Sequence, residues 1–275
     1  MTQNTLALKG GTAINLTILD LPRLSVDIDL DYSENQTREE MMNNRERITT
    51  DIKTFMTTQG YYLSEKSKSR HSLDSFVYQY TNLGGMKDNI KIEINYSLRS
   101  HIFEPQDREI ISNAIPGIQR VYSLIPCEIY ASKINALLSR AAARDLYDVY
   151  NMKQRNIFME SEYAMLRKSI VFYTAISQED DWKGYEINRI DSITAYKIKT
   201  DLLPVIQKGE VIPLDKMKED VKAFLSKLLI LNADEERFLH CFAMNEYRPE
   251  ILFEDAEIVN RLRNHPMALW KMQEH

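Results

Sequence analysis

Three aspartates alternate with apolar residues in the segment SVDIDLDY, residues 25–32. Side chains two positions apart on a strand point to the same face, so Asp27, Asp29 and Asp31 would share a face with Ser25. Carboxylates crowded on one face repel one another unless a cation compensates them. The pattern therefore indicates a strand that presents oxygen ligands to a cation.

A glycine pair precedes this strand, in the sequence Lys9-Gly10-Gly11-Thr12. It lies between a short strand predicted over residues 6–9 and a helix predicted over residues 13–19. Glycine permits a positive φ and a close backbone approach, and the first N–H groups of a helix attract phosphate oxygens. We therefore expect a seat for phosphate at this turn.

A second alternating stretch, NIKIEINYSL at residues 89–98, supplies a further carboxylate. Its isoleucines share one face, and Lys91 and Glu93 point to the other. Three carboxylates beside a phosphate seat suit Mg²⁺, with Mn²⁺ as the alternative, because hard cations prefer oxygen ligands. Two such ions can activate an attacking hydroxyl and stabilise a leaving pyrophosphate.

Other signals complete a mixed α/β unit around these strands. Thr37 and Glu40 form a capping box for a helix that Gly60 ends. SFVYQYTNL predicts a strand, and the pair Gly84-Gly85 predicts the hairpin turn that leads into the next one.

From about residue 116 the sequence becomes helical, with helical periodicity over residues 126–155, 219–244 and 254–272. The predicted fold class is therefore α+β. We expect a mixed-sheet domain over residues 1–115, followed by a helical domain over residues 116–275.

The ordered motifs resemble those of polymerase-β-type nucleotidyltransferases. More closely, they resemble the AbiEii family, the toxin half of type IV toxin–antitoxin systems, to which MenT-type toxins are similar. The resemblance runs through LKGGTAINL…LPRLSVDIDLDY, KIEI, Lys133 in ASKINALLSR, and Arg144 to Asp148 in RDLYD. It spans residues 8–150 and covers the rest only as a generic helical half. The first motif begins close to Met1, where family members commonly carry a helical lead.

The resemblance implies a role for each motif residue. Gly11 and Thr12 would hold the triphosphate, and Lys133 would neutralise charge on the β- and γ-phosphates. Asp145 would act as a base toward the acceptor or would orient Lys133. The implied catalytic residues are Asp27, Asp29, Glu93, Lys133 and Asp145, and the implied metal ligands are Asp27, Asp29 and Glu93. The implied nucleotide-binding residues are Lys9, Gly10, Gly11, Thr12, Ser25, Lys133 and Arg144.

The resemblance also implies a function, that of an Mg²⁺-dependent nucleotidyltransferase toxin. It would transfer a nucleotide from an NTP to an RNA acceptor, for which we expect tRNA. An AbiEi-like antitoxin would be its partner, and phage defence its setting. Two alternatives stay open: transfer to a protein or small-molecule hydroxyl, and an inactive nucleotide-binding regulator.

Each chemical interpretation has a structural alternative. The DIDLD acids could form a solvated strand edge, although an EF-hand loop is excluded because the required glycine and closing Glu are misplaced. Glu93 could pair with Lys91. The charges of Lys133 and of the RDLYD segment could lie on exposed helix surfaces or in a salt bridge.

For two further features, two interpretations remain open. Arg23 contacts phosphate or merely lies in the loop before the strand. The run YYLSEKSKSR at residues 61–70 places two tyrosines beside Lys66, Lys68 and Arg70. It suits single-stranded RNA, but we favour a solvated strand and loop.

Composition sets outer limits. The 275 residues are 27% charged and 44% hydrophobic, which is typical of a globular protein. A net charge of −5 argues against a generally basic nucleic-acid coat but not against a local basic surface. Cys127 and Cys241 form no metal or redox motif and are predicted to be free thiols. No apolar run reaches the length of a membrane span, so we expect a cytoplasmic protein without membrane contact.

Overall fold

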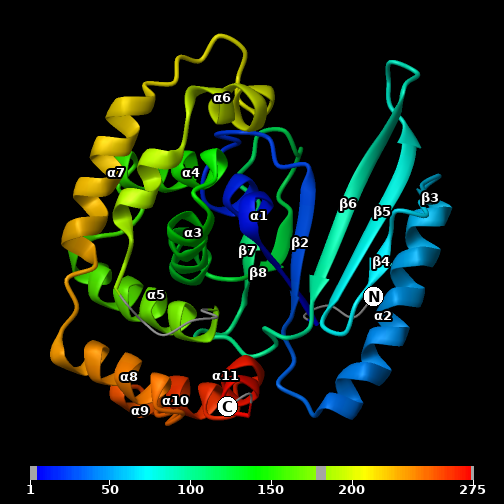
Figure 1. The fold of residues 1–275 in the computed structure, drawn as a ribbon. Helices are drawn as coiled ribbons and strands as arrows, with labels where there is room; N and C mark the ends of the chain where they lie inside the picture. Colours follow the sequence, from blue (N-terminus) through cyan, green and yellow to red (C-terminus); the bar gives the residue numbers. More distant parts are fainter. Residues whose placement is uncertain (1–4, 178–183, 274–275) are drawn as a thin grey trace. The chain divides into compact units, whose positions relative to one another are not determined.

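The computed structural model describes residues 5–177 and 184–273, which fall into two compact units (Figure 1). The first unit comprises residues up to Asp20 together with Ser25–Leu124, and the second comprises Leu21–Leu24 and the chain from Ile125 onward. The division expected after residue 115 falls between the last two strands of the sheet.

Eight strands of the described residues form one mixed sheet in the first unit, which confirms the predicted α+β class. The order is β3-β5-β6-β2-β1-β8-β7, and β4 also pairs with β5. β2 runs parallel to β6 and β1 runs parallel to β8, whereas the other pairs are antiparallel. The strands are β1 (Leu6–Lys9), β2 (Asp27–Tyr32), β3 (Tyr62–Leu63), β4 (Lys68–Ser69), β5 (Leu73–Thr81), β6 (Lys87–Asn95), β7 (Gln106–Glu109) and β8 (Arg120–Ser123).

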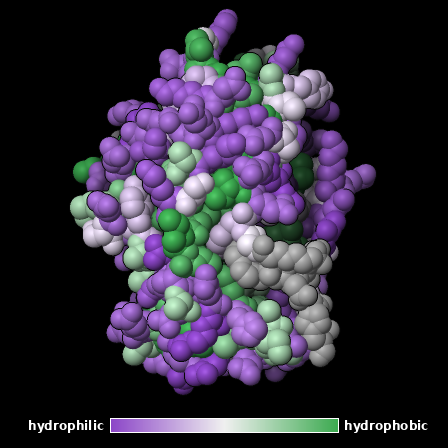
Figure 2. All heavy atoms as spheres, turned by 60° about the vertical axis from the view of Figure 1, so that its left-hand side comes forward, coloured by the Kyte–Doolittle hydropathy of each residue, from purple (hydrophilic) through white to green (hydrophobic). Residues whose placement is uncertain are grey.

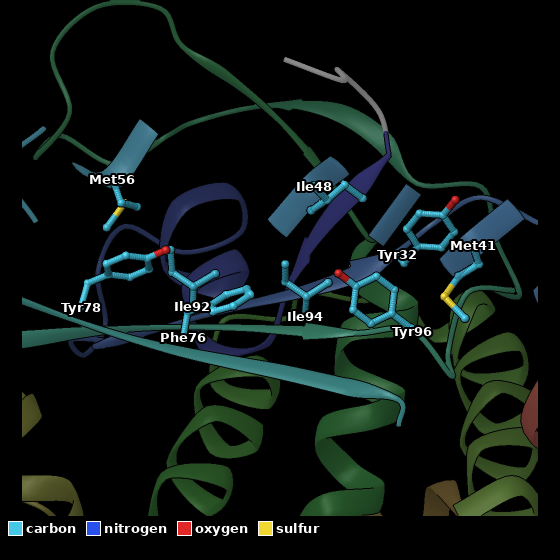
Figure 3. Packing of buried hydrophobic residues seen from close by; sticks show 9 residues of the cluster. All are labelled: Tyr32, Met41, Ile48, Met56, Phe76, Tyr78, Ile92, Ile94 and Tyr96. Carbon is cyan, nitrogen blue, oxygen red and sulfur yellow. The ribbon is translucent and has the colours of Figure 1, made fainter. Parts of the chain in front are cut away.

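Alternation gives this sheet one apolar face and one charged face. The apolar face is covered by α2 (Arg38–Thr58), which begins with the predicted Thr37–Glu40 capping box. Figure 3 shows the resulting core, in which methionines and an isoleucine of α2 pack on tyrosines, isoleucines and a phenylalanine of the strands. Its buried members are Tyr32, Met41, Ile48, Met56, Phe76, Tyr78, Ile92, Ile94 and Tyr96. The charged residues of β2 and β6 therefore lie on the opposite face.

Two strands were not predicted. β7 has the sequence QDRE and carries no apolar alternation, and β8 lies beyond residue 116, in the part that was expected to be helical. Backbone hydrogen bonds hold both strands in the sheet, since β8 pairs with β1 and β7 pairs with β8.

The second unit is helical, but its first predicted stretch is interrupted. Ala141 adopts a left-handed conformation, with φ 46° and ψ 56°, and ends α3 (Pro126–Arg140) before α4 (Ala143–Gln154) begins. The stretch over residues 219–244 likewise divides into α7 (Leu214–Leu228) and α8 (Ala233–Ala243), where Asn232 caps the second helix. The remaining helices are α1 (Gly10–Thr17) of the first unit, α5 (Tyr163–Ser177), α6 (Ala195–Lys197), α9 (Pro249–Leu252), α10 (Ala256–Leu262), α11 (Pro266–Lys271) and the short helical turns η1 (Glu160–Glu162), η2 (Ile187–Ser192), η3 (Ile198–Leu202) and η4 (Leu203–Val205).

Among the described residues, no helix is both long enough and apolar enough to cross a membrane. The face drawn in Figure 2 is mostly hydrophilic, with a patch of hydrophobic residues near its middle. The large exposed side chains of the second unit include Tyr196, Val211, Ile230 and Met244.

A buried ion pair fastens α2 to the sheet. Arg45 of α2 donates to both carboxylate oxygens of Asp74 on β5, at 2.9 Å from Nε and 2.6 Å from Nη2. Asp74 is only 2% exposed, so the guanidinium compensates a charge that water cannot reach.

We expect Arg45→Ala to lower the free energy of unfolding by about 3 kcal/mol, because it leaves a buried carboxylate without its main partner. Urea denaturation measures this change. The matched control is Arg47→Ala, two residues along α2, since Arg47 is exposed and donates to Asn44 in an exposed hydrogen bond, so its loss should change stability by less than about 0.5 kcal/mol. Equal losses in both variants would contradict this role for the pair.

Candidate active site

The register of the sheet brings the predicted acidic residues onto one face of the first unit. β2 lies between β1 and β6, so that Asp29 is aligned with Glu93 on one side and with Lys9 on the other. Asp27 is aligned with Lys91. Aligned residues in a sheet point to the same face. Three carboxylates and two ammonium groups therefore share this part of the face.

Lys91 compensates Glu93. Its Nζ lies 2.9 Å from Oε2 of Glu93, two positions along the same strand. Burial lowers the pKa of the Lys91 ammonium, but the hydrogen bond to Glu93 and the charges of Glu93, Asp27 and Asp29 outweigh it and raise the pKa above its usual value. The pairing weighed as the structural alternative for Glu93 is thus present.

Lys9 compensates the third aspartate of the strand. Its Nζ lies 2.5 Å from Oδ1 of Asp31, whose side chain is 2% exposed. Burial raises the pKa of the Asp31 carboxyl, and the nearby Lys9 ammonium only partly offsets this. Lys9, expected to bind nucleotide, therefore holds Asp31 in this structure.

The glycine turn lies directly against Asp29. Gly10 has φ +67°, and a Cβ added there would meet Oδ2 of Asp29 at 2.5 Å. A larger side chain would displace the carboxylate or the turn, so only glycine fits this position.

α1 begins at this turn, although the helix was predicted to begin at residue 13. Its N-cap, Lys9, supplies no side-chain hydrogen bond to the first turn, whose N–H groups have no partner within the helix itself. The Thr12 hydroxyl donates to the backbone oxygen of Asp27 at 2.5 Å. Thr12 therefore ties the start of α1 to the start of β2, and Gly11 is buried beside it.

No group of three or more His, Cys, Asp or Glu side chains within residues 5–177 and 184–273 is arranged to hold a metal ion. Asp27 and Asp29, two positions apart on β2 and next to the start of α1, nevertheless fit Mg²⁺. In proteins this ion is commonly bound through one or two carboxylates, with substrate phosphates and water as its other ligands. Glu93, the third carboxylate predicted for this set, forms an ion pair with Lys91.

The second unit contains a cluster of charged side chains built on α3 and α4, two helices that are labelled in Figure 1. Lys133 of α3 points its Nζ between two carboxylates of α4, at 3.0 Å from Asp145 and 3.2 Å from Asp148. The two aspartates are three positions apart and so lie on the same face of α4. The turn at Ala141 brings α4 back along α3, so that residues 12 positions apart meet.

Two arginines complete this cluster. Arg23, 4% exposed, forms a bidentate pair with Asp148, with distances of 2.7 Å from Nε and 2.7 Å from Nη2. Arg140 donates from Nε to Asp145 at 2.8 Å, but its own side chain is 63% exposed. Asp148 is therefore held by a buried partner and Asp145 by one that water reaches.

The electrostatics of the cluster favour the charged forms of Lys133 and Asp145. Burial lowers the pKa of the Lys133 ammonium, but the charges of Asp148 and Asp145 outweigh burial and raise the pKa. Burial raises the pKa of the Asp145 carboxyl, but Lys133 and Arg140 outweigh it, so the pKa is lowered. Lys133 is thus a fixed cation with a side chain that is 12% exposed.

Two further predicted nucleotide-binding residues are Arg144 and Ser25. Arg144 of α4 donates from Nε to the backbone oxygen of Asp201 at 2.8 Å. Ser25 precedes β2, which begins at Asp27 rather than at residue 25.

Sequence reasoning left the roles of Arg23 and Arg140 open or unstated. Arg140 lies seven positions after Lys133 on α3, a spacing that places both on one helix face and could have indicated the pairing. Arg23 is 125 residues from Asp148, and no local pattern signals such a pair.

Comparison with known proteins identifies the family. The family described as nucleotidyl transferase AbiEii toxin, Type IV TA system, matches residues 2–244. The chain belongs to the AbiEii family of nucleotidyltransferase toxins. It is therefore a nucleotidyltransferase and the toxin of a type IV toxin–antitoxin system, which implies a nucleotide substrate and an antitoxin partner.

The fold is also found in a solved structure. The chain is similar to MenT4, a nucleotidyltransferase toxin from Mycobacterium tuberculosis H37Rv, with a TM-score of 0.62 and 18% sequence identity. The similarity covers 96% of this chain and 85% of MenT4. No match was found among curated proteins.

We expect Gly10→Ala to reduce nucleotide transfer by about 100-fold, because displacement of a positioned carboxylate by about 1 Å has an effect of that size. A labelled-NTP assay measures the rate. Gly85→Ala is the matched control, since Gly85 has φ +76° but nothing within 4 Å of an added Cβ. Both variants carry similar backbone strain, and only the first meets Asp29. Full activity of Gly10→Ala would show that the close approach is dispensable.

We expect Arg23→Ala to destabilise the toxin by about 3 kcal/mol, since it removes the buried bidentate partner of Asp148. Arg140→Ala is the comparison, and it should cost less than about 1 kcal/mol because Arg140 is largely exposed. Urea denaturation of both variants separates the two effects. A smaller loss for Arg23→Ala than for Arg140→Ala would refute the assignment of Arg23 as the main support of Asp148.

Proposed function

We propose that this toxin is an Mg²⁺-dependent enzyme that transfers a nucleotide from an NTP to a hydroxyl of an RNA acceptor, with tRNA as the acceptor. The observation that carries the proposal is the arrangement of Asp27 and Asp29 on one face of β2, with the Gly10 turn in contact range of Asp29. Membership of the AbiEii family supports the type of reaction, whereas the acceptor and the metal belong to the proposal.

Asp27 and Asp29 would hold the metal. When bound there, Mg²⁺ would supply activation of the acceptor hydroxyl and neutralisation of phosphate charge. Glu93, in its ion pair with Lys91, would act beside these two ligands by fixing the charge next to Asp29.

The first turn of α1 would receive the triphosphate. The backbone N–H groups of Gly11 and Thr12 suit phosphate oxygens, since they stand at the positive end of the helix. The hydroxyl of Thr12 is engaged by the backbone of Asp27, so its contribution to a phosphate is through its N–H. Ser25 and Arg144 would supplement these contacts.

In the reaction, the oxygen of the acceptor hydroxyl forms a bond to the α-phosphorus of the NTP. The bond from that phosphorus to the bridging oxygen of the β-phosphate breaks, pyrophosphate leaves, and the hydroxyl proton passes to a base. Lys133 would neutralise charge that develops on the β- and γ-phosphates. Asp145 would orient Lys133, to which its Oδ1 already accepts a hydrogen bond.

In the cell, we propose that this chemistry inactivates RNA needed for translation during phage infection. An AbiEi-like antitoxin would restrain it. The family supports the pairing of toxin and antitoxin, and the phage setting follows from the resemblance to abortive-infection systems.

The test incubates the toxin with each labelled NTP and bulk tRNA. We expect label on RNA for the unaltered protein, and a loss of at least about 100-fold for Asp29→Asn, because loss of a metal ligand exceeds the 10- to 100-fold effect of losing an outer partner. Chelation of Mg²⁺ by EDTA should abolish labelling, and added Mg²⁺ should restore it.

The matched control is Asp107→Asn, which alters an exposed aspartate of the same sheet and should retain full labelling. Label on a protein or small molecule instead of RNA would overturn the acceptor assignment. Equal labelling by Asp29→Asn would overturn the site itself.

A further inference from the structure

One row of aligned residues crosses five strands of the charged face. From the outer edge inward, its members are Lys68 on β4, Ser75 on β5, Glu93 on β6, Asp29 on β2 and Lys9 on β1. Figure 1 shows β3 and β4 along the outer edge of β5. Neighbouring strands lie about 4.8 Å apart, so Lys68 is about 14 Å from Asp29 on the same face.

The outer end of this row is positive and exposed. Lys66, Lys68 and Arg70 are exposed, and none of them forms an ion pair with a residue in the described part of the chain. Tyr62 on β3 is aligned with Gln79 of β5, which shares the face of Ser75. Its side chain is 71% exposed. We call Tyr62, Lys66, Lys68 and Arg70 the basic edge.

These four side chains contribute little to the stability of the fold. Three cations that form no ion pair within residues 5–177 and 184–273 add like-charge repulsion, and an exposed tyrosine ring contributes little to packing. By contrast, Tyr61, the preceding residue, packs on Tyr80 with ring centroids 5.4 Å apart. The basic edge therefore offers free charge and a free ring, which are the groups that bind the phosphates and bases of single-stranded nucleic acid.

The surface between the basic edge and Asp29 also suits an RNA strand. Ser75 is uncharged, and Glu93 is compensated by Lys91 at 2.9 Å. No uncompensated carboxylate of this row lies between Lys68 and Asp29, so phosphates could follow the row with little repulsion.

We propose that the basic edge binds the single-stranded end of the RNA acceptor a few nucleotides upstream of the reacting hydroxyl, which then reaches Asp29 along the row. Lys66, Lys68 and Arg70 bind phosphates, and Tyr62 stacks on a base. This inference rests on the proposed function, because it assigns the acceptor subsite of the same reaction.

The test measures binding of a short fluorescein-labelled single-stranded RNA by anisotropy over a series of salt concentrations. Each phosphate contact to a single strand contributes about 0.7 to the slope of log K against log salt. The variant Lys66→Ala/Lys68→Ala/Arg70→Ala should therefore lose about 2 from that slope. Tyr62→Ala should weaken binding by about tenfold, an effect typical of one stacked base.

Two exposed residues of α2 provide matched controls on the face opposite the row. Lys53→Ala removes a cation that forms no ion pair with a described residue, and Phe55→Ala removes a ring that is 47% exposed. Both should leave affinity and slope unchanged. Melting temperatures of all variants should match that of the unaltered protein, because the altered side chains are exposed. A triple variant with an unaltered slope would overturn the proposal.

Failure of this inference and failure of the proposed function give different results. If RNA is never labelled but the triple variant loses RNA affinity, the acceptor assignment fails and the basic edge stands as an RNA-binding surface. If the triple variant labels subsaturating RNA at the full rate, the basic edge is overturned while the proposed reaction stands. Asp29→Asn should bind the RNA with full affinity, which separates binding from chemistry.

Discussion

Repulsion among the carboxylates of β2 is the constraint on which the arrangement of the first unit depends. Positions two apart on a strand are separated by about 6.6 Å, so each pair of charges costs about 2.5 kcal/mol at an effective dielectric constant of about 20. The neighbouring strands reduce this repulsion with ammonium groups, that of Lys9 on one side and that of Lys91 on the other. Each lysine occupies a register position that faces the acids. A strand placed elsewhere in the order would leave the repulsion uncompensated.

In the helical unit the buried charge is a cation, and carboxylates around it keep it charged. Lys133 is held by two aspartates, and these in turn are shared with arginines of unequal burial. Asp148 is fixed because Arg23 is only 4% exposed, whereas Arg140, the arginine partner of Asp145, is 63% exposed. Arg23 belongs to the stretch Leu21–Leu24 of the helical unit, and Asp27 follows it four positions later. The segment that leads into the acidic strand is thus anchored by the same carboxylate that supports Lys133.

The sequence predicted those parts of the architecture that depend on residues close together in the chain. Alternation predicted the faces of β2 and β6, and the Thr37–Glu40 pair predicted the start of α2. The break at Ala141 has no such signal, because alanine rarely adopts a left-handed conformation and its neighbours favour helix. β7 pairs without an apolar face of its own. The site likewise has a part that the sequence predicts and a part that it does not. The charged face of β2 follows from the sequence, whereas the bond from Arg23 to Asp148 and the pairing of Lys9 with Asp31 depend on segments brought together by the fold.

The balance of charge within each unit bears on the reaction. On the sheet, Asp27, Asp29, Asp31 and Glu93 outnumber Lys9 and Lys91, which leaves two negative charges on that face. In the helical unit, Arg23, Lys133 and Arg140 outnumber Asp145 and Asp148, which leaves one positive charge. Partial compensation keeps each cluster stable enough to fold, and the remaining charge is what a ligand can neutralise. A divalent cation matches the first excess and a phosphate group matches the second.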